Sequence, residues 1–133
     1  MLRRAVIERL RGQVSTLGGR AYQAFVAPPN AAKPYVTVKV PGARGSAAIT
    51  YAGTQPVEVR LYDDPASFVA LDALEAAVIT ALHGVEVEDS HEASPGRYRL
   101  DWVPGGGDFV DEELSLIGRL VTFEAAILNE RGG

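Results

Sequence analysis

Two histidines are the side chains in this sequence best suited to proton transfer or metal binding. His83 ends an apolar segment with helical spacing, and His91 lies in a polar stretch between Ser90 and Glu92. A zinc or iron site needs several ligands in a fixed geometry, and neither histidine has a second one at a ligand spacing. A Ser–His relay also needs an orienting acid, which adjacency in sequence does not supply. We expect His83 to act as a cation at the negative end of a helix.

Carboxylates form two groups that could, in principle, act as acid and base. A glycosidase holds two carboxylates across a cleft. Asp63 and Asp64, however, stand directly before Pro65, a pattern typical of a helix start, with Asp64 as the cap. The second group, residues 111–113, follows a glycine-rich stretch and is expected to be a solvated acidic loop. The pairs therefore predict capping and solvation, and no general acid–base catalysis.

Neither phosphate binding nor thiol chemistry is indicated. Gly105-Gly106-Gly107 lacks the lysine, the serine or threonine and the following helix of a phosphate-binding loop. The chain has no cysteine, so disulfides, thiolate zinc sites and cysteine nucleophiles are excluded. The sequence predicts no enzyme: we expect no catalytic residue, no metal site and no cofactor.

Composition predicts one globular domain over residues 1–133. Hydrophobic residues make up 47% of the chain and charged residues 23%, which is normal for a single domain of this size. Charge returns at Arg3, too early for the apolar part of a signal peptide, and no apolar run is long enough for a membrane span. The net charge of −4 disfavours a dedicated nucleic-acid binder. We expect a soluble protein with no membrane and no sequence-specific nucleic-acid partner.

Charge is distributed unevenly along the chain. Residues 1–20 carry five arginines against one glutamate, whereas residues 84–124 carry ten acidic residues against three arginines. Opposed charges of this kind suit head-to-tail contact between copies of one chain. An unevenly charged solvated surface would explain the same counts, and the sequence leaves both interpretations open.

Two segments have the apolar spacing of amphipathic helices. In residues 2–17, every third or fourth residue is apolar, which predicts one buried face, and Gly18-Gly19 ends the segment. A second helix is predicted from Pro65 to Leu82, with Gly84 behind it. The first helix is expected to bury five residues: Leu2, Val6, Leu10, Val14 and Leu17.

Strand patterns occupy most of the remaining chain. They fall at residues 21–27, 35–40, 56–62, 85–88, 97–103 and 116–128. Two long loops are expected at residues 41–53 and 104–113. Strands interrupted by two isolated helices predict an α+β fold in the order α-β-β-β-α-β-β(-β), with a mainly antiparallel sheet and both helices on one face.

The order and spacing of these pieces resemble the tail terminator (tail completion, or minor tail) proteins of long-tailed bacteriophages. The resemblance rests on the helix at residues 2–10, the entry Lys33-Pro34-Tyr35-Val36 into a strand, and the strand around Val57–Tyr62. It continues through the helix at 65–82 and the final strand Arg119–Ala125, and it covers about residues 2–128. The loop at 104–113 matches nothing in that family.

The resemblance implies a structural protein that forms a ring, usually a hexamer, on the last ring of the tail tube. Such a ring ends tube polymerisation and provides the surface that joins tail to head. The implied partners are further copies of the chain, the tail tube protein and head–tail connector proteins, with DNA passing through the ring. The implied location is the tail or neck of the virion, assembled in the host cytoplasm.

Charge and loop length select the candidate contact residues. We expect arginines of the first helix on one side of the subunit contact: Arg3, Arg4, Arg9 and Arg11. We expect acidic residues on the other side or facing the ring lumen: Asp111, Glu112 and Glu113. A loop containing Arg44, Ile49 and Tyr51 is expected to reach a neighbouring ring.

Two other functions remain open at this stage. Another phage neck component, a head–tail connector or adaptor, would have the same small ring-forming character. A dimeric ligand-binding or enzymatic α+β domain would need a pocket with converging polar groups, and the sequence offers no such cluster.

Overall fold

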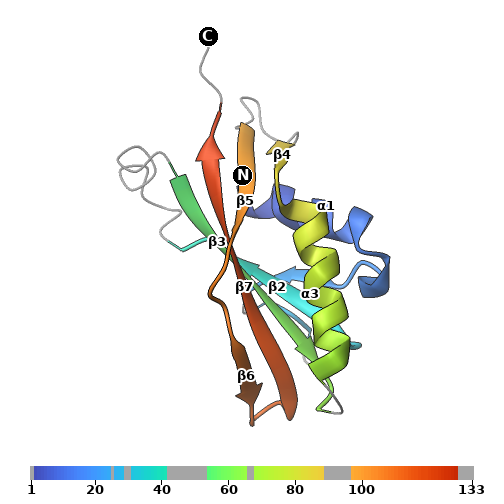
Figure 1. Cartoon of the computed structure of the whole chain (residues 1–133). Helices are drawn as coiled ribbons and strands as arrows, with labels where there is room; N and C mark the ends of the chain where they lie inside the picture. The colour runs from blue at the N-terminus through green and yellow to red at the C-terminus, as the bar shows by residue number, and fades with distance from the viewer. Residues whose placement is uncertain are drawn as a thin grey trace.

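A computed structural model of the chain describes residues 2–24, 26–28, 31–41, 54–65, 68–88 and 97–128. The helical elements are α1 (Leu2–Gln13), the short 3-10 helix η1 (Ser15–Leu17) and α3 (Phe68–Leu82). The strands are β1 (Ala21–Gln23), β2 (Tyr35–Lys39), β3 (Thr54–Asp63), β4 (Val85–Glu88), β5 (Arg97–Val103), β6 (Asp108–Asp111) and β7 (Leu116–Ile127). Figure 1 shows the two longer helices beside a strongly twisted sheet.

The strands form one sheet in the order β1-β2-β3-β7-β5-β4. Strand β7 is central: β3 pairs with it along one edge, while β5 and β6 share the other edge one after the other. All these pairs are antiparallel, and only β1 and β2 run parallel. The predicted α+β class with a mainly antiparallel sheet is therefore confirmed.

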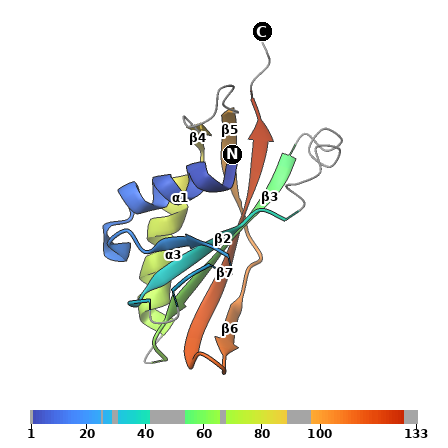
Figure 2. The same cartoon turned by 180° about the vertical axis from the view of Figure 1, so that it is seen from behind.

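Both helices pack on the same face of the sheet, as predicted (Figures 1 and 2). Alternate residues of the central strands face them, because side chains alternate along a strand. Phe123 of β7 is fully buried in this layer. All five apolar residues predicted for the buried face of the first helix, from Leu2 to Leu17, lie in the same core.

Several predicted boundaries were wrong. The first helix is interrupted at Val14, and η1 then continues to a left-handed Gly18. The strand predicted at 21–27 ends at Gln23. Pro65 lies in a turn and α3 is described from Phe68 onward, while the Asp64 N–H donates a hydrogen bond to the Asp63 side chain. The cap predicted at Asp64 would bind residues 66 and 67, which lie outside the described part of the chain.

The predicted loop at 104–113 was wrong for residues 108–111, which form β6. Gly107 leads into this strand and accepts a hydrogen bond from the Leu120 N–H at 2.9 Å. At Gly106 the chain passes so close to β7 that a Cβ there would overlap the Leu120 carbonyl. A glycine is therefore required at position 106, where the chain crosses from β5 to β6. Of the predicted loop at 41–53, residues 42–53 lie outside the described part of the chain.

Candidate interaction surfaces

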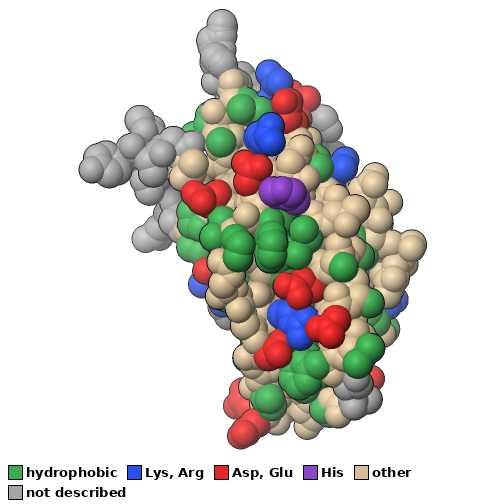
Figure 3. All heavy atoms as spheres, viewed as in Figure 1, with side chains coloured by type: hydrophobic (Ala, Val, Ile, Leu, Met, Phe, Trp, Pro, Cys, Tyr) green, Lys and Arg blue, Asp and Glu red, His purple; other side chains and the backbone are tan. Residues whose placement is uncertain are grey.

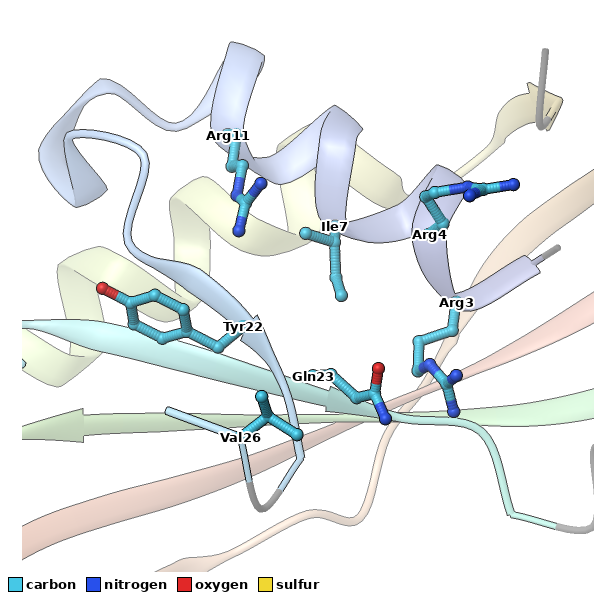
Figure 4. A pocket seen from close by; sticks show the side chains of 7 residues that line it. All are labelled: Arg3, Arg4, Ile7, Arg11, Tyr22, Gln23 and Val26. Atoms are coloured by element: carbon cyan, nitrogen blue, oxygen red, sulfur yellow. The ribbon is translucent and has the colours of Figure 1, made fainter. Parts of the chain in front are cut away.

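A groove rich in arginine lies between α1 and β1 (Figure 4). Its volume is about 360 Å³. Arg3 and Arg4 come from the first turn of α1 and Arg11 from its last turn, with Ile7 between them. The opposite wall comes from β1 and the segment after it. The lining residues are Arg3, Arg4, Ile7, Arg11, Tyr22, Gln23 and Val26.

Two of the predicted contact arginines also bind backbone within the chain. The Arg11 Nε and Nη2 groups donate to the Ala21 carbonyl at 3.0 and 2.8 Å, which fastens α1 to β1. The Arg9 Nε group donates to the Ala81 carbonyl at 2.8 Å near the end of α3. A carbonyl does not neutralise a guanidinium, so Arg11 still brings positive charge to the groove. Arg9 lies outside the groove and joins the two helices.

Replacing Arg9 tests that structural role. We expect Arg9→Met to lower the free energy of unfolding by about 1–2 kcal/mol, because the partly buried Ala81 carbonyl loses a charged donor. Urea denaturation measures the change. Gln13→Met, an exposed change in the last turn of the same helix, serves as the control and is expected to stay within about 0.5 kcal/mol of the parent. Equal losses in the two variants would contradict the assignment.

The predicted acidic residues sit on the hairpin between β6 and β7, and they differ in role. The Asp111 carboxylate accepts a hydrogen bond from the Leu114 N–H at 3.1 Å and closes the turn. Ser115 has a φ of 55° and completes the reversal. Glu112 and Glu113 are exposed at the tip. Asp111 therefore shapes the turn, while the two glutamates carry the negative charge outward.

The hairpin tip also exposes apolar side chains. Leu114 is 52% exposed and Val110 is 63% exposed. At the same end of the molecule, where α3 begins, Phe68 and Val69 are exposed as well (Figure 1). Exposed apolar side chains beside charged ones are typical of surfaces that contact another protein.

A row of four aromatic rings supports this hairpin on the sheet face opposite the helices. Tyr22 and Tyr35 meet edge to face with centroids 6.0 Å apart, and Tyr35 stacks on Tyr62 at 5.0 Å. Phe109 of β6 then meets Tyr62 at 5.6 Å. Burial raises the pKa of Tyr35, with smaller contributions from Tyr62 and Asp111, so the phenol stays uncharged within the row. The sequence analysis missed this row.

Arg119 of β7 links the hairpin to α3 on the other face of the sheet. Its guanidinium binds Asp72 at 2.6 Å and Glu75 at 3.0 Å on α3, and also binds Asp108 on β6. These hydrogen bonds, first that to Asp108, raise the pKa of Arg119 against the opposing effect of burial. Acidic and basic side chains cluster on the face shown in Figure 3. The three carboxylates thus surround a guanidinium.

His83 makes a structural contact as well. Its Nδ1 accepts a hydrogen bond from the Trp102 backbone N–H at 2.9 Å, which ties the end of α3 to β5. His83 therefore lies at the end of α3, where the sequence placed it, and contacts the neighbouring strand.

Within the ranges that the structure describes, no group of three or more His, Asp or Glu side chains could hold a metal ion. None of the described helices is long and apolar enough to cross a membrane. Arg44, Ile49 and Tyr51, predicted to reach a neighbouring ring, lie outside the described residues.

Comparison with known proteins gives one informative similarity. No family model matches the chain, and no curated protein matches it. The fold is similar to a chain from the virion of a native gene transfer agent (GTA) particle, with a TM-score of 0.68 and 25% sequence identity. The match covers 95% of this chain and 93% of that one. Similarity over nearly the whole of both chains supports a structural component of a phage-like virion.

Proposed function

We propose that the chain is a tail assembly protein that forms a ring on the end of the tail tube, stops tube growth and provides the surface for head joining. The observation that carries the proposal is the full-length similarity to a chain of a gene transfer agent virion. The resemblance of the sequence to tail terminator proteins points in the same direction. In this role the protein binds copies of itself, the tube protein and a connector, and it catalyses nothing.

The surfaces described above fit a ring-forming subunit. A ring with cyclic symmetry needs two different complementary patches on each copy. The arginine groove and the acidic hairpin tip provide patches of opposite charge on different parts of the fold. A hexamer is expected from the resemblance. A connector or adaptor elsewhere in the neck would need similar patches, so partner choice separates the two roles.

Capping of tubes tests the proposal. Purified protein is mixed with tail tubes of its own particle, and tube ends are imaged by negative stain while light scattering follows mass and tube growth. We expect one ring at a tube end and an arrest of elongation at a stoichiometric amount of protein. Binding to portal complexes but not to tubes would favour the connector role. A stable dimer that ignores both would contradict a neck function.

A further inference from the structure

The hairpin tip and the arginine groove are complementary in both charge and polarity. The tip presents two exposed carboxylates, Glu112 and Glu113, next to the exposed Leu114. The groove presents Arg3 and Arg11, which extend from α1 toward β1 on either side of Ile7, with Arg4 at its edge and the exposed Val26 on the opposite wall. The tip is therefore negatively charged and the groove positively charged, and both expose apolar side chains.

The two surfaces lie far apart within one chain. In Figures 1 and 2, which differ only by a turn about the vertical axis, the β6–β7 hairpin forms the lower end, whereas α1 lies in the upper half. The hairpin cannot bend upward freely, because the aromatic row holds one side of it and Arg119 holds the other. A contact between tip and groove must therefore join two copies.

We infer that the hairpin tip of one copy inserts into the arginine groove of the next. In this contact Glu112 and Glu113 pair with the groove arginines, and Leu114 packs on the apolar floor. The volume of about 360 Å³ lies in the range of pockets that hold small molecules, so it can accept the end of a hairpin. The inference rests on the proposed function in one respect, namely that the repeated contact closes a ring.

The composition of the groove favours a protein partner. Arginine and tyrosine are enriched where proteins bind one another, and both occur here. A groove for a nucleic-acid backbone would be expected in a basic protein, but this chain has a net charge of −4. Since one tip fits one groove, an open row of copies keeps an unoccupied groove at one end and an unoccupied tip at the other until the ring closes.

Cysteine cross-linking tests the contact directly, since the native sequence contains no cysteine. Leu114→Cys and Gln23→Cys are made in separate chains and mixed under mild oxidation, with and without tail tubes. A disulfide requires Cα atoms roughly 4.4–6.8 Å apart. We expect the mixed dimer to form at least about tenfold faster than in a control pair of Leu114→Cys with Glu88→Cys, whose exposed site lies on β4.

Two further readouts sharpen the result. A chain with both substitutions should give a disulfide ladder that ends at the ring size. Cross-linking should slow at high salt, because exposed charge pairs are screened. Yields equal to the control pair, both with and without tubes, would overturn the inference.

The design also separates this inference from the proposed function. If the wild-type protein formed rings on tube ends but the Leu114→Cys and Gln23→Cys chains did not cross-link, only the tip-in-groove contact would be overturned. Efficient cross-linking by a protein that leaves tube ends bare would retain the contact and overturn the capping role. If the protein formed neither rings nor cross-links, both the tip-in-groove contact and the capping role would be contradicted. If DNA protected Gln23→Cys from a thiol reagent but a second copy did not, the groove would be a polyanion site.

Discussion

Replacing Arg119 with leucine is expected to destabilise the protein by about 2–3 kcal/mol and to loosen the β6–β7 hairpin. The Arg119 side chain is only 13% exposed and binds three carboxylates on two elements. Its removal leaves Asp72, Glu75 and Asp108 close together without a counter-charge. Breaking a fully buried pair costs about 3–5 kcal/mol. We expect less here, because Asp72 is 66% and Asp108 47% exposed to screening solvent.

Urea denaturation at low and high salt measures this effect. High salt should recover part of the loss in Arg119→Leu, because it screens the repulsion among the remaining carboxylates. The matched control is Arg97→Leu, which removes one exposed ion pair with Glu86 and should change stability by less than about 1 kcal/mol. If the two variants lost the same stability, Arg119 would not be the link between hairpin and α3.

Adding a single methyl group at Gly118 is expected to cost about 2–3 kcal/mol. Gly118 lies on β7 directly opposite Phe109 of β6. A Cβ there would lie 2.3 Å from Phe109 Cζ and 2.4 Å from Cε1, so the ring must leave its place beside Tyr62. Overpacking of this kind typically costs about 1–3 kcal/mol, and here it also separates β6 from the aromatic row.

A double-mutant cycle isolates that cause. Phe109→Ala alone should destabilise by about 1–2 kcal/mol, since a partly buried ring is lost. Gly118→Ala should then cost little more in the Phe109→Ala background, because the space is free, giving a coupling energy above about 1 kcal/mol. If the losses of stability in the two single variants simply added, glycine would be required at position 118 by the backbone and not by contact with the Phe109 ring.

The helices and most strands could be predicted because their buried faces repeat locally. The apolar residues spaced three or four apart from Leu2 to Leu17 predicted a helix face. The alternation of side chains from Arg97 to Val103 predicted a strand, and its bounds are confirmed. Strand β6 was missed because it has four residues, two of them acidic, and is defined by pairing with β7. The aromatic row was missed because only the strand register brings Tyr22, Tyr35 and Tyr62 together.

Charge clustering in the sequence selected the candidate contact residues, and the structure shows where those of them that it describes lie. Arg3 and Arg4 line one groove and Glu112 and Glu113 lie at one tip, as their clustering in the sequence indicated. Their use in subunit contact stays a prediction. The structural role of Arg9 could not be predicted from the sequence, because the group that accepts its hydrogen bond is the Ala81 carbonyl in the other helix.

The central position of β7 has a consequence for synthesis of the chain on the ribosome. β7 separates β3 from β5, and it is the last strand in the described sequence. Until β7 is present, the β2–β3 and β4–β5 pairs are not joined to each other, and the edges of β3 and β5 that pair with β7 stay open. Such pairings between distant segments form slowly and leave exposed strand edges open to misassembly. The sheet therefore cannot be completed until β7 is available, and the β6–β7 hairpin forms at the same step.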